Sequence, residues 1–310
     1  MTIPIILDCD PGHDDALAIA LALGSPELDV LAITTVAGNA SLERTTRNAL
    51  RILTLLDRVE IPVAGGADRP LIREPYVPVE FHGPSGLDGA DLPEPAVRQA
   101  EASAVELIAD LLRRAREPVT LVATGPLTNV ALLLRAIPGL SARIAEISLM
   151  GGSLAGGNTT AAAEFNIWAD PEAAAVVFDS GIPIRMSGLD ITHQALVLRP
   201  DIERLEALGT RPGRVFADLM RYFAVHHQER YGWAGPPIHD AVAIAWLVAP
   251  GLIGSRSLRI DVETAGTVTR GRTVADVEGL AGRPPNATVG MSIDRDGLLD
   301  LVIGAVGRFR

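Results

Sequence analysis

Two kinds of hydrophobic pattern alternate along nearly the whole chain. Short continuous apolar runs are followed by segments in which apolar residues recur at helical spacing. Residues 3–9 form an isoleucine-rich run that ends before Pro11-Gly12, which is typical of a buried strand. Residues 14–24 then show a helical pattern, with acidic residues in the first turn and Gly24 at the end. The chain is therefore predicted to begin with a strand and a helix.

The same alternation predicts the elements that follow. Further strands are expected at residues 28–38, 119–125, 144–152 and 182–190. Helices are expected at residues 41–56, at about 127–136, and from Pro171, with Ser41 and Asp170 as N-caps. From about Leu258 the pattern predicts a β-hairpin that turns at Ala265-Gly266, then a short strand and a closing helix.

This order of elements defines a fold class. Strands that alternate with helices pair in parallel and form a sheet covered on both faces. The segments rich in proline and glycine follow strands and do not separate two compact halves. We therefore expect an α/β protein with an open, mainly parallel central sheet of Rossmann-like type, in a single domain that spans residues 1–310.

Polar side chains gather where the predicted strands end. They are Asp8, Asp10, Asp14 and Asp15 after the first strand, Asn39 after the second, Thr124 later in the chain, and then Asn158, Glu164 and Asn166. Ligands of open parallel sheets bind at the carboxyl ends of the strands. These separate segments are therefore predicted to build one site at one edge of the sheet.

The aspartate cluster indicates a metal. Four carboxylates lie within eight positions, whereas a helix needs only one N-cap, a role that Asp14 alone could fill. Repulsion among four carboxylates has to be neutralised, and carboxylate oxygens are the preferred ligands of calcium and magnesium. We therefore expect a bound divalent cation beside the first helix.

Three further segments carry candidate chemistry. His239-Asp240 opens an apolar helical pattern; the pair is either a helix cap or a metal ligand with a neighbouring acid. Glu164 and Asn166 lie two positions apart and suit sugar hydroxyl groups, unless they belong to an ordinary polar loop. His82 alone is a weak signal. The aromatic residues and paired histidines of residues 221–237 suggest packing and surface more than a pocket.

Composition narrows the possible functions. The 310 residues include 27 basic and 38 acidic side chains, a net charge of −11, which argues against nucleic acid as a partner. Every basic residue is arginine, so lysine-dependent phosphate loops and Schiff bases are excluded. Cys9 is the only cysteine, which excludes an internal disulfide.

The apolar segments predict no membrane association. The longest apolar run, residues 241–254, contains Pro250 and is too short to cross a bilayer. The first residues show neither a basic region nor a cleavage site for secretion. A cytoplasmic protein is therefore expected.

Together these segments resemble the inosine–uridine-preferring nucleoside hydrolases. The resemblance covers nearly the whole chain, and its most specific motif is DCDPGHDDALAI near the N-terminus. The weaker motifs occur in the family's order: GN at Asn39, HGPSGL at His82, ATGPLTN at Thr124, MGG at Met150, GNTTAAAEFNIWADPEAA, and HDAVAI at His239. Where the family usually has a proline before AEFN, residues 161–163 are alanines, which bears on the rigidity of that loop.

The resemblance implies a fold, a reaction and roles for individual residues. It implies the nucleoside hydrolase fold and calcium-dependent hydrolysis of the N-glycosidic bond of ribonucleosides, giving free base and ribose. The implied calcium ligands are Asp10, Asp15, the backbone carbonyl of Thr124, and Asp240. The implied ribose contacts are Asp14, Asn39, Asn158, Glu164 and Asn166, with Met150 lining the sugar pocket. Asp10 would be the general base, His239 the acid at the leaving base, and His82 a residue on the base side.

The resemblance also implies a homodimer or homotetramer, while the preferred base stays open because residues 222–237 differ among family members.

Two alternative functions are also compatible with the sequence. A haloacid-dehalogenase-type phosphatase also has an Asp-x-Asp after its first strand, but Pro11-Gly12 and the lack of lysine disfavour it. A non-enzymatic sugar- or calcium-binding protein would bind ribose without turnover.

Overall fold

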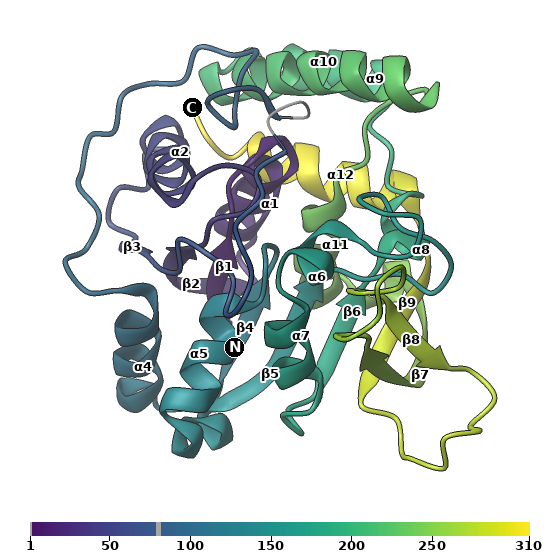
Figure 1. The fold of residues 1–310 in the computed structure, drawn as a ribbon. Coiled ribbons are helices and arrows are strands. Elements are labelled where there is room, and N and C mark those ends of the chain that lie inside the picture. Colours follow the sequence, from purple (N-terminus) through teal and green to yellow (C-terminus); the bar gives the residue numbers. More distant parts are fainter. Residues whose placement is uncertain (1, 79–81) are drawn as a thin grey trace.

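A computed structural model describes residues 2–78 and 82–310, and nine strands of this part of the chain form one sheet (Figure 1). Its spatial order is β3 (Val63–Gly65), β2 (Leu28–Thr35), β1 (Ile3–Cys9), β4 (Val119–Ala123), β5 (Ile144–Met150), β6 (Ile184–Ser187), β9 (Ala287–Ile293), β7 (Ile253–Val262) and β8 (Thr273–Asp276). The strands from β3 to β9 in this order are parallel, and β7 pairs antiparallel with both β9 and β8. The predicted open, mainly parallel sheet is confirmed.

Helices cover both faces of the sheet because its strands are apolar on both sides. Ile5 and Leu7 of β1 belong to one buried cluster, and Ile6 between them belongs to another. The first cluster includes α1 (His13–Gly24), α2 (Leu42–Leu55), α9 (Arg199–Ala207), α10 (Arg211–Tyr231), α11 (His239–Val248) and α12 (Arg295–Val306). The second includes α4 (Ala104–Arg114), α5 (Thr128–Ala136) and α7 (Pro171–Phe178). The short helices α6 (Phe165–Ala169) and α8 (Leu189–Thr192), with 3₁₀ turns at Pro138–Arg143 and Pro250–Leu252, complete the elements.

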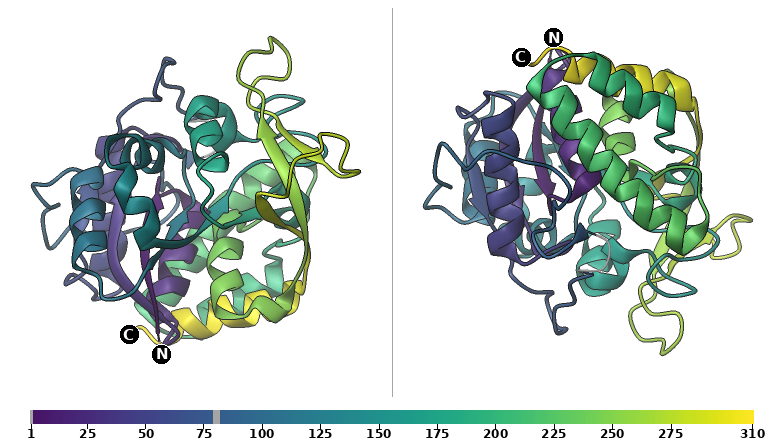
Figure 2. Two further views of the ribbon diagram at one scale, coloured as in Figure 1. Left: turned by 90° about the horizontal axis from the view of Figure 1, so that it is seen from below. Right: turned by 90° about the horizontal axis from the view of Figure 1, so that it is seen from above.

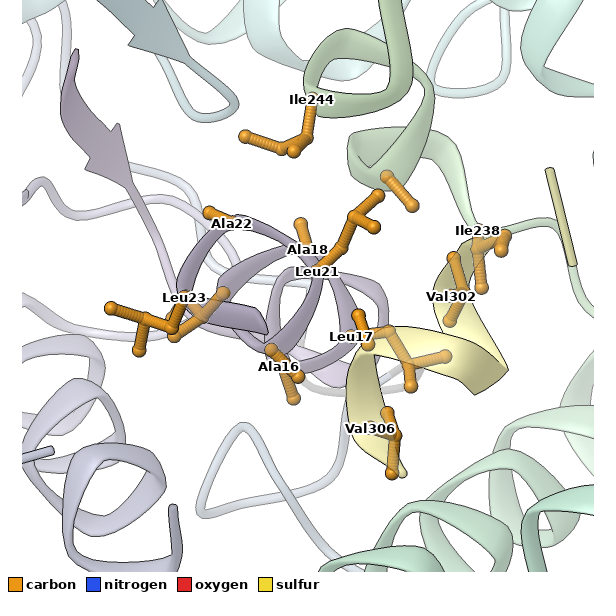
Figure 3. Close-up of a cluster of buried hydrophobic side chains, with 14 of the residues drawn as sticks. Ala16, Leu17, Ala18, Leu21, Ala22, Leu23, Ile238, Ile244, Val302 and Val306 are labelled. Atoms are coloured by element: carbon orange, nitrogen blue, oxygen red, sulfur yellow. The ribbon is translucent and has the colours of Figure 1, made fainter. Parts of the chain in front are cut away.

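Helix α1 is the centre of the larger cluster. All twelve of its residues are buried, as expected for a helix that is apolar all round. It packs against α11 and α12, and Figure 3 shows Leu17 of α1 beside Val302 and Val306 of α12. This packing fixes the first turn of α1, with its aspartates, beneath the strand ends.

The order of the strands places a switch point at β1. The chain runs outward from β1 through β2 to β3, then returns to add β4 on the other side of β1. Asp8 pairs with Ala123, and the backbone N–H of Thr124 donates to the carbonyl of Asp8 at 2.9 Å. The ends of β1 and β4 therefore lie together where open α/β sheets bind ligands.

Several local predictions are confirmed and others need correction. Asp170 caps α7, its carboxylate accepting from the N–H of Ala173, with Pro171 as the first helical residue. Ser41 occupies the N-cap of α2 but makes no side-chain capping bond. Helices α4 and α9 were not predicted, although Ser103 and Glu106 form a capping box at the start of α4.

The predicted hairpin is present, with a wider connection than expected. Strand β7 begins at Ile253 and ends at Val262, and β8 begins only at Thr273. Ala265 and Gly266 lie inside this connection because the carboxylate of Glu263 accepts from both of their N–H groups. Both views in Figure 2 show the yellow-green β7–β8 region projecting from the molecule.

Among the described helices, none is long and apolar enough to cross a membrane.

Candidate active site

A cavity of about 350 Å³ lies at the carboxyl ends of the strands. Of the twelve residues to which the resemblance assigns a role, ten line this cavity: Asp14, Asn39, His82, Thr124, Met150, Asn158, Glu164, Asn166, His239 and Asp240. The other two, Asp10 and Asp15, are buried directly beneath it and both hydrogen-bond to Asn39. The structure therefore brings these twelve residues together, from segments more than 200 residues apart. Asp8, which the sequence also predicts at this edge, does not line the cavity, and its Oδ1 accepts from Thr34 and Asn129 instead.

Asp10 has one satisfied and one unsatisfied carboxylate oxygen. Its Oδ2 accepts from the backbone N–H of Asn39 at 2.7 Å. Its Oδ1 is buried and has no hydrogen-bond partner in the described part of the chain. A side chain at Gly38 would collide with Oδ2, and a Cβ at Gly125 would lie 2.8 Å from Oδ1. A buried anionic oxygen without a partner is costly, so this atom requires a ligand.

Three further carboxylates meet beside Asp10. One carboxylate oxygen from each of Asp14, Asp15 and Asp240 lies within 4.8 Å of the others. Asp15 is held in place by the N–H of Gly12 at 2.9 Å and the hydroxyl of Thr124 at 3.0 Å. This set contains Asp14, which the resemblance assigns to the ribose, and lacks Asp10, which it assigns to the metal.

The carboxylates raise one another's proton affinity. Burial, followed by repulsion from Asp15, raises the pKa of Asp14 to about 7 and that of Asp10 well above its ordinary value. Burial and the neighbouring aspartates do the same to the pKa of Asp240. A divalent cation would offset both causes, and donors made only of oxygen suit a hard cation. The residues present therefore fit a metal ion.

Glu164 and Asn166 are fixed by the start of α6. Glu164 is the N-cap, and its carboxylate accepts from the N–H groups of Gly152 and Asn166, each at 2.9 Å. Burial raises the pKa of Glu164 to about 7 despite these bonds. Asn166 Nδ2 donates to the carbonyls of Thr124 at 2.7 Å and Met150 at 3.1 Å. With its amide hydrogens used, Asn166 presents its Oδ1 to a ligand as an acceptor.

Asn158 and His82 are anchored as well. Asn158 Oδ1 accepts from the N–H of Phe165 at 2.9 Å. His82 Nδ1 lies 3.1 Å from Nδ1 of His13, whose Nε2 lies 2.8 Å from the carbonyl of Asp88. Burial lowers the pKa of His82 well below its ordinary value and that of His13 to about 4. His82 is therefore a held, uncharged ring at the cavity wall.

His239 and Asp240 begin α11 but do not cap it. The N-cap is Ile238, which makes no side-chain capping bond, so the capping interpretation of the pair is wrong. His239 Nδ1 lies 2.7 Å from the hydroxyl of Thr192. Burial lowers the pKa of His239 well below its ordinary value, and repulsion from His193 lowers it further.

Aromatic residues form one wall of the cavity, so the interpretation of residues 221–237 as packing and surface more than a pocket is wrong. Phe223, His227 and Tyr231 line the cavity at four-residue intervals along α10, and Trp233 follows them. Tyr231 stacks on Trp233 with ring centroids 4.9 Å apart. The i, i+4, i+8 spacing places these side chains on one helix face and could have indicated a shared surface. His193, also in the cavity wall, follows a short helix that no periodic pattern marks.

The chain matches known enzymes over nearly its whole length. Residues 5–300 match the family model described as inosine-uridine preferring nucleoside hydrolase. The chain is 54% identical over 303 residues to the pyrimidine-specific ribonucleoside hydrolase RihA of Escherichia coli, with 97% of each chain covered. The protein of the same name from Salmonella arizonae gives the same identity and coverage.

Solved structures of similar proteins share the fold. The purine-preferring ribonucleoside hydrolase from Gardnerella vaginalis has a TM-score of 0.93 and 33% identity, with 98% of each chain covered. An inosine-guanosine nucleoside hydrolase has a TM-score of 0.91 and 29% identity over the full length of both chains. The named base preferences differ among these proteins, although the fold does not.

Proposed function

Because the chain belongs to the inosine–uridine preferring nucleoside hydrolase family and hydrolyses ribonucleosides, we propose that it does so with calcium as cofactor and Asp10 as general base. The observation that carries this proposal is the buried Oδ1 of Asp10, which has no partner in the described chain, in a site where carboxylate oxygens of Asp14, Asp15 and Asp240 lie within 4.8 Å of one another. Asp10, Asp15, Asp240 and the carbonyl of Thr124 would hold the ion. A bound calcium ion would lower the pKa of a water molecule in the site.

The residues of the chain divide the remaining work. Asp10 removes the proton from the attacking water as the bond between C1′ and the base nitrogen breaks through an oxocarbenium-like sugar. The negative field of the buried carboxylates favours that developing positive charge. Asp14, Asn39, Asn158, Glu164 and Asn166 hold the ribose hydroxyl groups, with Met150 against the sugar. His239 acts as the hydrogen-bonding acid at the departing base, and His82 lies on the base side of the pocket.

We further propose that pyrimidine ribonucleosides are the preferred substrates. The two relatives at 54% identity are named pyrimidine-specific, whereas the purine-preferring structure is only 33% identical. The wall formed by Phe223, His227, Tyr231 and Trp233 offers ring faces on which a base can stack.

A panel of ribonucleosides tests this function. Purified protein is expected to release ribose from uridine and cytidine with kcat/KM at least about 10-fold above that for inosine, a difference of ~1.4 kcal/mol in the transition state. Free ribose and free base are measured together, and free phosphate from uridine monophosphate is measured in parallel. Equal kcat/KM for inosine would contradict the base preference. Phosphate release without ribose release would support the phosphatase alternative.

A second prediction concerns the sugar. 2′-Deoxyuridine is expected to be hydrolysed far more slowly than uridine, because Glu164 and Asn166 would lose a hydroxyl partner in a buried site. Each buried polar group left unpaired costs ~1–3 kcal/mol. The measurement is kcat/KM for the two substrates at equal calcium concentration. Equal values would remove these two residues from recognition of the hydroxyl groups.

A further inference from the structure

Thr192 touches His239 from outside the cavity. It is the last residue of α8, is fully buried, and places its Oγ1 2.7 Å from Nδ1 of His239. Thr192 Oγ1 makes no other hydrogen bond within the part of the chain that the structure describes. Thr192 does not line the cavity, so its effect on a bound substrate must pass through the imidazole ring.

The backbone around Thr192 holds it firmly. Its N–H donates to the carbonyl of Gly188 at 3.0 Å, and the N–H of Leu189 donates to the carbonyl of Gly152 at 2.9 Å. The N–H of Gly152 in turn donates to Glu164. The partner of His239 is therefore tied to the same loop that fixes Glu164 in the sugar half of the site.

The hydrogen of the Thr192 hydroxyl decides which ring nitrogen of His239 is protonated. If Nδ1–H of a neutral ring donated to Oγ1, the hydroxyl hydrogen would have no acceptor among the described residues. A buried donor without an acceptor is costly, whereas an unused hydroxyl lone pair costs less. The favoured arrangement is a bond from the hydroxyl to Nδ1, which leaves the ring hydrogen on Nε2.

We infer that Thr192 is a positioning residue, which accepts no ring hydrogen from Nδ1 of His239 and keeps one on Nε2, so that Nε2–H donates a hydrogen bond to the departing base. This inference rests on the proposed function for its chemistry. As the C1′–N bond breaks, its electron pair stays on the base, and the Nε2–H bond stabilises that negative charge. No proton has to leave the ring in this step.

Two substitutions at Thr192 separate the hydroxyl from the packing. Thr192→Val keeps the branched shape and removes the hydroxyl, and Thr192→Ser keeps the hydroxyl. Thr192→Val is expected to lower kcat/KM for uridine by about 10-fold, the effect of one hydrogen bond, and Thr192→Ser to restore most of it. For p-nitrophenyl riboside, whose leaving group needs no donor, Thr192→Val is expected to stay within about 2-fold of wild type.

Two further variants serve as controls for the Thr192→Val measurement. His239→Ala is expected to lose activity on uridine while keeping most activity on the activated riboside. Thr45→Val removes another buried hydroxyl, which donates to the carbonyl of Val36 at 3.0 Å, and should leave the ratio of the two substrates unchanged. Thermal unfolding shows whether each variant is folded.

The outcomes distinguish the inference from the function on which it rests. If His239→Ala lowers kcat/KM for uridine more than for the activated riboside but Thr192→Val does not, the role of Thr192 is wrong and that of His239 stands. If His239→Ala lowers both activities equally, the proposed role of His239 falls and the inference falls with it. Equal losses on both substrates in Thr192→Val would show that the hydroxyl supports the site as a whole, and would overturn its role toward the departing base.

A spectroscopic measurement needs no substrate. In protein labelled with ¹⁵N-histidine, the His239 signals are identified by their loss in His239→Ala. We expect a protonated Nε2 and an unprotonated Nδ1 in the calcium-loaded wild type, and a mixture of the two tautomers in Thr192→Val. A protonated Nδ1 in the wild type would overturn the inference.

Discussion

Asp10→Asn is expected to lower kcat on uridine by ~10²–10⁴, the usual contribution of a positioned base. The substitution keeps the size of the side chain, so the glycines that approach it closely at positions 38 and 125 still fit. It removes the negative charge whose Oδ1 has no partner in the described structure, and with it the group that accepts the proton of water. The measurement is the steady-state rate at saturating uridine and calcium.

Asp8→Asn is the matched control for this variant. Asp8 is buried in β1, two residues before Asp10, but its Oδ1 accepts from the hydroxyl of Thr34 at 2.6 Å and from Nδ2 of Asn129 at 2.8 Å. An asparagine oxygen can accept both bonds, so kcat should change by less than about 10-fold. Nearly wild-type turnover in Asp10→Asn would assign the general base to another residue.

Removal of calcium is expected to abolish hydrolysis, and calcium should restore it. Without a cation, burial raises the pKa of the Asp10 and Asp240 carboxyls well above the ordinary value, and repulsion from Asp14 and Asp15 adds to the increase. Because the ion would bind the folded chain and not the unfolded one, it should also raise the melting temperature. At free calcium of 100 Kd the added stability is about 2.7 kcal/mol.

The calcium experiment needs a metal assay and a competing ion. Elemental analysis establishes that the stripped protein holds no calcium, and magnesium is then added in place of calcium. Full activity in verified metal-free protein would refute the metal-dependent mechanism. Recovery with magnesium but not with calcium would keep the carboxylate site and change its ion.

The parts of this fold that depend on local pattern could be predicted from the sequence. The run of residues 3–9 and the apolar helix after it are read from periodicity alone, because a parallel strand and a central helix are buried on every side. The four aspartates of residues 8–15 also stand out in the sequence, because one helix needs only one N-cap. The position of Asp170 as a cap followed from the proline after it.

Other parts of the site depend on packing between distant elements, which no local pattern contains. The faces of α10 that turn toward the cavity are set by its contacts with α9 and α1. The spacing of Phe223 and His227 therefore indicates a shared helix face, but not that this face lines the cavity. Thr192 becomes relevant only because α11 places His239 beside it, 47 positions along the chain.

The contact between the first and last helices has a consequence for how the enzyme is made. Helix α1 and the aspartates of its first turn leave the ribosome first, and α12 leaves it last. Until then, the face of α1 that packs against α12 has only solvent or chaperone to cover it. The N-terminal carboxylates can therefore reach their final arrangement only after α12 has been made. Nascent chains that stop before residue 295 should therefore carry the DCDPGHDD motif without a finished metal site.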